Sequence, residues 1–164
     1  MTSSDGVQIR PAVPDDAEPL AQLQIEVWED AYGGLMPASV FEHRRATLDD
    51  RVDRWRQILD GAPSRTTVAE VAGALVGFAS IGPPRDDDVI VDEELWALYV
   101  LASWWGKRVG HSLLAATLAD RASYLWVLCG NDRAIEFYRK HGFTPDGVTR
   151  RDDHGDELRM TRQL

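Results

Sequence analysis

ELWALYVLASWWGKRVGHSLL, residues 94–114, joins an apolar run of strand length to the start of a helix. A continuous apolar run of this kind is typical of a central strand that is covered on both faces. Gly106 and Gly110 stand in the turn, next to the first helical amides, which have no partner within the helix. Such amides, with the charges of Lys107 and Arg108, suit a pyrophosphate. A corner that merely packs tightly is the alternative, and the stretch alone leaves both open.

Hydrophobic periodicity outward from this stretch predicts alternating strands and helices. In chain order we expect a strand at 7–12, helices at 14–32 and 38–59, a hairpin around Ala72–Gly73, an acidic loop at 83–93, the central strand at 94–101, a helix to about Arg121, a strand at 124–130, a helix at 131–142 and a closing hairpin around 152–156. This order indicates an α/β or α+β fold with a mixed sheet. No repeat or linker interrupts it, so we expect one domain over residues 1–164, with residues 1–6 disordered.

The composition limits the classes of function. The 164 residues carry 18 Lys and Arg against 27 Asp and Glu, a net charge of −9, so we expect no nucleic-acid partner. An acidic surface suits cationic partners such as amines, although acidity more often serves solubility. No apolar run approaches the roughly 20 residues of a membrane span. The single cysteine and the absence of a signal-like start lead us to expect a cytoplasmic protein. The histidines lack metal-ligand spacing, so we expect no metal.

Motifs around the opening stretch resemble those of the GCN5-related N-acetyltransferase (GNAT) superfamily in its small bacterial form. The family's pyrophosphate loop reads Gln/Arg-x-x-Gly-x-Gly/Ala at the start of a helix. After the next strand, the family has an asparagine and then a Phe-Tyr-x-x-x-Gly-Phe segment, which are matched by Asn131, Phe137, Tyr138, Gly142 and Phe143. The resemblance implies a mostly antiparallel sheet of six or seven strands flanked by about four helices.

The resemblance also implies acetyl-CoA as co-substrate. The residues that it places at CoA are Leu98, Tyr99, Val100, Trp105, Gly106, Lys107, Arg108, Val109, Gly110, His111, Asn131 and Tyr138. Trp105 stands where the family has Gln or Arg, and backbone amides can hold phosphates without that side chain. Arg108 stands where the family has its central glycine. A side chain is tolerable there if the local backbone is right-handed helical, so we expect weakened or rearranged binding at worst.

Acetyl transfer needs a neutral amine, and with a pKa of ~10.4 only about one amine in a thousand is neutral at pH 7. A positioned carboxylate or a water chain would remove the proton. Glu94 is the first candidate, Asp92 and Glu93 are alternatives, and all three could equally be solvated loop charges. Some family members carry an acidic base on the next strand, where this chain has Trp126. That route therefore looks closed.

The remaining roles follow from the resemblance. Tyr138 occupies the position of the family's general acid, which protonates the departing thiolate. Backbone amides of Leu98 to Val100 would stabilise the thioester oxygen if the strand bulges there. Asn131 would bind the cofactor, although capping of the following helix explains it equally well. The expected acceptor-lining residues are Trp28, Tyr32, Leu35 and Trp96, each of which could instead be ordinary core.

The prediction is therefore an N-acetyltransferase that moves the acetyl group of acetyl-CoA to a primary amine of a small molecule or peptide, by direct attack in a ternary complex. A non-catalytic sensor that binds acyl-CoA is the main alternative. A protein that binds ATP or NAD through the loop is a third, but Ser or Thr does not follow the lysine as such a loop requires. The sequence leaves the acceptor and the oligomeric state open, a homodimer included.

Overall fold

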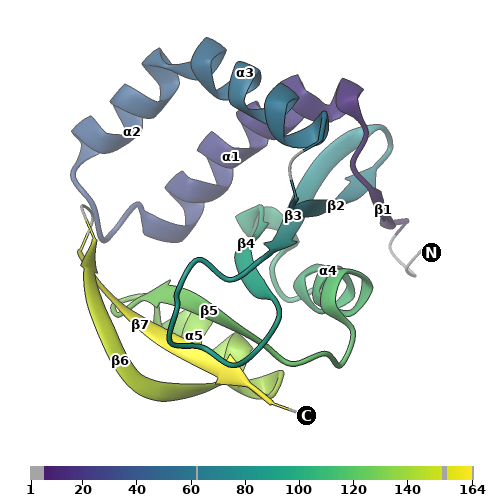
Figure 1. Ribbon diagram of the computed structural model, residues 1–164. Helices are drawn as coiled ribbons and strands as arrows, with labels where there is room; N and C mark the ends of the chain where they lie inside the picture. The colour runs from purple at the N-terminus through teal and green to yellow at the C-terminus, as the bar shows by residue number, and fades with distance from the viewer. Residues whose placement is uncertain (1–5, 62, 153–154, 164) are drawn as a thin grey trace.

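The computed structural model describes residues 6–61, 63–152 and 155–163, and Figure 1 shows a twisted sheet with helices on both sides. The expected disorder of residues 1–6 falls, except for Gly6, outside the described residues. The elements are β1 (Gln8–Pro11), the short 3-10 turn η1 (Pro14–Asp16), α1 (Ala17–Tyr32), α2 (Ala38–Ala46), α3 (Leu48–Leu59), β2 (Arg65–Val71), β3 (Ala74–Gly82), β4 (Glu94–Val100), the turn η2 (Ala102–Trp104), α4 (Val109–Leu118), β5 (Ser123–Leu128), α5 (Asp132–Lys140), β6 (Thr144–Asp152) and β7 (Gly155–Arg162).

The seven strands form one sheet in the order β1-β2-β3-β4-β5-β7-β6. Every neighbouring pair is antiparallel except β4 and β5, which confirms the predicted mixed, mostly antiparallel sheet. The predicted hairpin at Ala72–Gly73 is confirmed too, because Val71 pairs with Ala74 and both turn residues have positive φ, as two-residue hairpin loops require. In the closing hairpin Asp152 pairs with Gly155, and residues 153–154 of its turn lie outside the described part.

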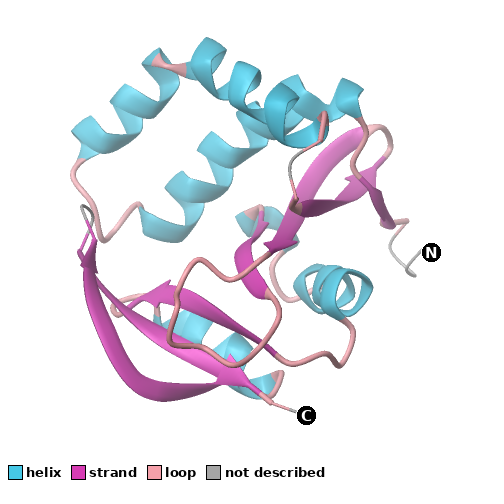
Figure 2. Ribbon diagram, in the orientation of Figure 1, coloured by secondary structure: helices cyan, strands magenta, loops and turns pink. Residues whose placement is uncertain are grey.

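Strand alternation directs the core to both faces of this sheet. On one face, Val68 and Phe78 pack with residues of α1 and α3. On the other face, Ala69 and Ala79 pack with residues of α4. Figure 2 shows α1, α2 and α3 gathered on one side of the strands, with α4 and α5 on the other side. The central position of β4 between these layers agrees with the continuous apolar run that the sequence presents.

The predicted helix over residues 38–59 is wrong as one helix, because the chain breaks at Thr47. Thr47 leaves helical geometry at φ −107° and ψ 27°, and its hydroxyl donates to the His43 carbonyl at 3.0 Å. A threonine that bonds backbone carbonyls in this way competes with helix continuation. The described residues therefore form five α-helices, close to the expected number, and α4 ends at Leu118, three residues before the expected end near Arg121. None of the helices in the described ranges is long and apolar enough to cross a membrane.

Candidate active site

The parallel strands β4 and β5 separate soon after they meet. Their pairing covers only Glu94 with Tyr124 and Leu95 with Leu125, so the rest of β4 has no strand beside it on this edge. A narrow cavity of about 90 Å³ opens in the gap. Its lining comes from α1, β4, α4, β5 and α5 and includes Tyr32, Trp96, Leu98, Tyr99, Val100, Gly110, Trp126, Asn131, Arg133 and Tyr138. This gap therefore collects residues from both halves of the chain.

The free edge of β4 presents backbone amides to the cavity. The Leu101 N–H donates to the Val76 carbonyl of β3 at 2.9 Å. Antiparallel alternation therefore directs the N–H groups of Leu98 and Val100 the opposite way, into the gap, while that of Tyr99 serves β3. The expected bulge lies earlier than Leu98–Val100, since Ser80 pairs with Ala97 and Ile81 with Leu95, which leaves Trp96 as the extra residue.

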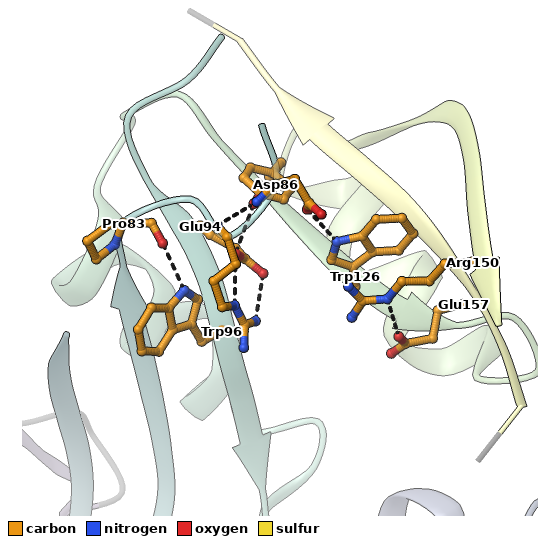
Figure 3. A network of polar contacts seen from close by, with 9 residues as sticks. Pro83, Asp86, Glu94, Trp96, Trp126, Arg150 and Glu157 are labelled. Atoms are coloured by element: carbon orange, nitrogen blue, oxygen red, sulfur yellow. Dashed lines mark hydrogen bonds and ion pairs between the residues drawn. The ribbon is translucent and has the colours of Figure 1, made fainter. Parts of the chain in front are cut away.

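Trp96 fits across β3 because residue 82 is glycine. A Cβ at Gly82 would lie 2.6 Å from the Trp96 ring, closer than atoms can approach. The indole Nε1–H of Trp96 donates to the Pro83 carbonyl at 3.3 Å, which Figure 3 shows at the edge of the network. The bulge and the glycine together place this large ring at the rim of the cavity.

The loop between β4 and α4 carries two residues in the left-handed region. Gly106 has φ 76° and Arg108 has φ 64° with ψ 17°. The condition under which a side chain would be tolerated easily at Arg108, a right-handed backbone, is not met: the residue takes the left-handed conformation that favours glycine, which the family's pattern has at this place. Its side chain is exposed, so the loop accommodates it without crowding the interior. Gly110 serves packing instead, because a Cβ there would meet the Phe137 ring at 3.3 Å.

A second hollow, of about 570 Å³, adjoins the cavity at the start of α4. It shares Val100, Gly110, Arg133 and Phe137 with the cavity, so the two form one continuous groove. The predicted loop residues that line it are Trp105, Gly106, Arg108, Val109, Gly110 and His111. Lys107 does not line it and lies over the Trp104 ring at 5.1 Å.

Three cationic or titratable residues of α5 and its end also face this hollow: Arg133, Lys140 and His141. The Arg133 guanidinium lies 3.5 Å from the centre of the Trp105 ring, and the Trp105 indole donates to the Val100 carbonyl at 2.8 Å. Trp105 thus holds Arg133 between the cavity and the hollow. Sequence reasoning missed Arg133, because its contact with the loop joins elements 28 positions apart.

His111 and His141 meet at the rim of the hollow. The Nδ1 of His111 lies 3.0 Å from the Nε2 of His141, whose Nδ1 lies 2.8 Å from the Phe137 carbonyl. A carbonyl only accepts, so the His141 Nδ1 carries a hydrogen. Partial burial, then the charge of Arg108, lowers the pKa of His111. The hollow therefore combines helix amides with two arginines, a lysine and two histidines in contact.

Tyr138 reaches the cavity from α5. Its side chain is buried, and burial followed by the nearby Tyr32 raises the pKa of its hydroxyl above the ordinary value for tyrosine. A phenol in this state keeps its proton throughout the neutral range, so the hydroxyl is present as a hydrogen-bond donor, while the raised pKa makes it a weaker acid than an ordinary tyrosine. Asn131 lies about two helical turns away, where its Oδ1 accepts from the Ala134 N–H at 3.3 Å and caps α5.

Glu94 is held in a network rather than free. Its carboxylate is 1% exposed, it pairs with the Arg85 guanidinium at 2.7 Å, and it accepts a hydrogen bond from the Tyr124 hydroxyl at 2.9 Å. The same carboxylate raises the pKa of Arg85. Figure 3 shows Glu94 directed toward the loop over residues 83–93. The charge of the Glu94 carboxylate therefore holds this loop in place through Arg85.

A second carboxylate, on the same loop, contacts a residue that lines the cavity. The indole Nε1–H of Trp126 donates to the carboxylate of Asp86 at 2.8 Å, and Trp126 lines the cavity (Figure 3). The sequence led us to regard the β5 position as lacking an acid, because Trp126 stands there. The structure brings Asp86 to that place from 40 positions away, which no local pattern reveals.

The four expected acceptor residues separate into two groups. Tyr32 and Trp96 line the cavity, and the Tyr32 hydroxyl lies 3.0 Å from that of Tyr99. Trp28 packs edge-on against Tyr32 with ring centres 4.8 Å apart, so it forms a layer behind the cavity. Leu35 lies outside the lining and covers Gly130, where a Cβ would meet it at 3.3 Å. Within the described residues, no three acidic, histidine or cysteine side chains are grouped to hold a metal.

Comparisons with known proteins agree with this geometry. A family model described as an acetyltransferase (GNAT) domain matches residues 62–145. The chain is 25% identical to an uncharacterized N-acetyltransferase, YuaI, of Bacillus subtilis over 139 residues, 84% of this chain and 68% of that protein.

Two solved structures share the fold. The PaiA N-acetyltransferase of Thermoplasma acidophilum, solved with coenzyme A, is 20% identical and superposes with a TM-score of 0.75 over 96% of this chain and 99% of that one. A GCN5-related N-acetyltransferase of Rhodopseudomonas palustris is 24% identical, with a TM-score of 0.72 over 100% and 98%.

Proposed function

We propose that this chain, which belongs to the GNAT acetyltransferase family and is therefore an acyltransferase that uses acetyl-CoA, transfers the acetyl group to a primary amine by direct attack in a ternary complex. The observation that carries the proposal is the continuous groove from the hollow at α4 to the gap between β4 and β5, with Tyr138 at its inner end. Along one path, the groove thus offers a site for phosphates, then the free edge of β4, and then a proton donor.

The phosphate end of the groove suits a pyrophosphate. The first amides of α4, together with Arg108 and Arg133, provide donors and positive charge there. Positive φ at Gly106 lets the backbone turn so that these amides face the hollow. We assign CoA phosphates to this end. Trp105 compensates for the side chain that the family has at its position by holding Arg133 in place.

The strand end suits an extended amide-bearing chain. The N–H groups of Leu98 and Val100 face the gap without a neighbouring strand, so a pantetheine arm would pair with β4 as an added strand does. The same amides are placed to donate to the thioester oxygen, where negative charge develops during attack. Gly110 keeps this path open because α4 passes close to Phe137.

Chemistry at the inner end needs one acid and one proton acceptor. The amine nitrogen forms a bond to the thioester carbon, the carbon–sulfur bond breaks, Tyr138 gives its proton to the departing thiolate, and the phenolate left behind regains a proton from solvent. The raised pKa of Tyr138 keeps that proton available at neutral pH. The proton lost by the amine passes to solvent through water at the mouth, where Asp86 is the accessible carboxylate. Glu94 is better suited to fixing the loop than to accepting a proton, because its oxygens already have partners.

Calorimetric titration tests the cofactor assignment. Acetyl-CoA and CoA should bind with one-to-one stoichiometry, and ATP should bind much more weakly because it lacks the pantetheine arm that the free edge of β4 recognises. Tight binding of ATP without binding of CoA would instead favour a nucleotide-binding protein.

Release of free thiol tests the transfer. The release would be followed with acetyl-CoA and a panel of amino acids, peptides, polyamines and aminoglycosides. We expect release with at least one primary amine and none with its N-acetylated form. Intact CoA binding with no release across the whole panel would favour a sensor that binds acyl-CoA.

A further inference from the structure

Two arginines on adjoining helices form a pair that no carboxylate balances. Arg44 lies in the last turn of α2, and Arg51 lies in the first turn of α3. In the part of the chain that the structure describes, neither makes an ion pair within 4.0 Å, whereas the neighbouring Arg45 pairs with Glu29. A hollow of about 350 Å³ beside them is lined by Ser39, Val40, His43, Arg44 and Arg51.

The pair carries an electrostatic cost. Burial, followed by the charge of Arg51, lowers the pKa of Arg44 to about 10. The Nε of Arg51 is buried and has no hydrogen-bond partner among the described residues. A buried donor without a partner is costly, and so are two like charges close together. A bound anion in the hollow would offset both charges, and paired guanidinium groups are well suited to carboxylates and phosphates.

The pair lies next to the groove but apart from its phosphate end. The Arg44 guanidinium lies 3.2 Å from the centre of the Trp28 ring, and Trp28 packs against Tyr32, which lines the cavity. One aromatic layer therefore separates Arg44 from the site of transfer. The hollow beside Arg44 and Arg51 shares no residue with the hollow at α4, and Figure 1 shows α2 and α4 on different sides of the sheet.

We propose that Arg44 and Arg51 bind an anionic group of the acceptor, a carboxylate or a phosphate, so that the acceptor is an amine that also carries negative charge. The inference rests on the proposed function, which supplies the transfer of an acetyl group to a primary amine. Glu157 of β7 supplies the opposite charge on the groove side, since it lies near enough to Tyr32 to contribute, after burial, to the raised pKa of that phenol. Amino acids, peptides with a nearby carboxylate and phosphorylated amines have this chemistry, and polyamines do not.

Direct anion binding tests the site without turnover. Protein saturated with CoA, so that the α4 hollow is filled, would be titrated calorimetrically with glutarate and, separately, with inorganic phosphate. Arg44→Gln and Arg51→Gln should each weaken binding by about 10- to 100-fold, as expected for a lost charge-assisted hydrogen bond, and Arg44→Lys should weaken it less. Arg56→Gln is the matched control, because Arg56 is an exposed arginine of α3 that pairs with Asp53.

Matched acceptors test the specificity. Peptides with a free C-terminal carboxylate would be compared with the same peptides as C-terminal amides, together with phosphoethanolamine and spermidine. We expect kcat/KM to favour the carboxylate or phosphate form by about tenfold or more in the wild type, and this ratio to fall to about one in Arg44→Gln. The relative size of the carboxylate and phosphate effects identifies the anion. An unchanged CoA affinity shows that each variant is folded.

The possible failures are distinguishable. A wild type that binds neither anion, or a preference for amides and spermidine that Arg44→Gln leaves unchanged, overturns the anion site and leaves the acetyl transfer intact. Anion binding that depends on Arg44 and Arg51, without thiol release for any amine, supports the anion site and contradicts the proposed function.

Discussion

Tyr138 illustrates how burial determines the use of a single side chain. The hydroxyl lies in the cavity among Tyr32, Tyr99 and Asn131, where a phenolate would be poorly solvated. Below a raised pKa the group stays protonated, so its ability to donate is constant from acid to moderately alkaline pH. The same burial that makes Tyr138 a core aromatic thus keeps its hydroxyl protonated.

Tyr138→Phe should lower kcat by about 100-fold, because a positioned general acid typically contributes that much. The affinity for CoA should stay almost unchanged, since the ring and its packing on Phe143 remain. Stopped-flow thiol release and calorimetric titration with CoA measure the two quantities. Equal turnover in the variant would refute the acid role.

Glu94→Gln distinguishes two possible roles of Glu94, a catalytic base and an anchor for the loop over residues 83–93. If Glu94 is an anchor, the substitution removes the ion pair with the half-exposed Arg85 and lowers the free energy of unfolding by about 1–2 kcal/mol, while the pH dependence of kcat keeps its position. If Glu94 is the base, the profile moves to higher pH. Asp86→Asn serves as the comparison, because Asp86 contacts Trp126 from the same loop. A shifted profile in Glu94→Gln alone would return Glu94 to the catalytic role.

The loop between β4 and α4 shows how an element can keep its shape after a change of residue. Arg108 stands where the family's pattern has glycine and still adopts φ 64°. A non-glycine residue in the left-handed region destabilises the folded state by about 1–2 kcal/mol. An arginine in this conformation therefore points to a use for the shape of the loop or for the charge of the side chain. The fixed shape and the exposed charge both face the hollow in which we place the phosphates.

Arg108→Gly and Arg108→Ala form a matched pair at this loop. Both remove the charge and should weaken CoA binding by a similar factor, about two- to tenfold, because the backbone amides remain. Glycine removes the strain whereas alanine retains it, so the glycine variant should be at least as stable to heat as the alanine variant. Calorimetry and thermal unfolding give both numbers. Loss of all CoA binding in both variants would show that the arginine side chain, and not the backbone amides, carries the binding.

At the scale of the molecule, local patterns predicted the fold well and the site less well. The apolar run of β4, the hairpin at Ala72–Gly73 and the cap at Asn131 are local signals, and the structure confirms the strand, the turn and the cap. The break at Thr47 was missed, because helical periodicity runs through it and the hydroxyl bond that ends α2 leaves no pattern of its own.

The site contacts that the sequence missed all join distant segments. Asp86 meets Trp126, Arg133 meets Trp105, and Arg44 meets Trp28. Each contact is made by an arginine or aspartate, and the sequence alone does not distinguish a solvated charge from one that contacts a distant side chain. Only the packing of α1 to α3 and of loop 83–93 against the central strands brings these pairs together.

We propose that residues 1–164 behave as one cooperative domain, because a single sheet links the first strand to the last. Near-ultraviolet and far-ultraviolet circular dichroism should then report the same thermal transition, and saturating CoA should move both together to higher temperature. The six tryptophans, spread from residue 28 to residue 126, report on most of the chain. Two separated transitions would contradict a single domain.

The most direct test of the account is a crystal structure of the protein with CoA bound. We expect the pyrophosphate on the amides at the start of α4, the pantetheine arm along the free edge of β4 at Leu98 and Val100, and the sulfur within hydrogen-bonding distance of the Tyr138 hydroxyl. CoA bound away from this groove, or in it with the sulfur far from Tyr138, would contradict the account.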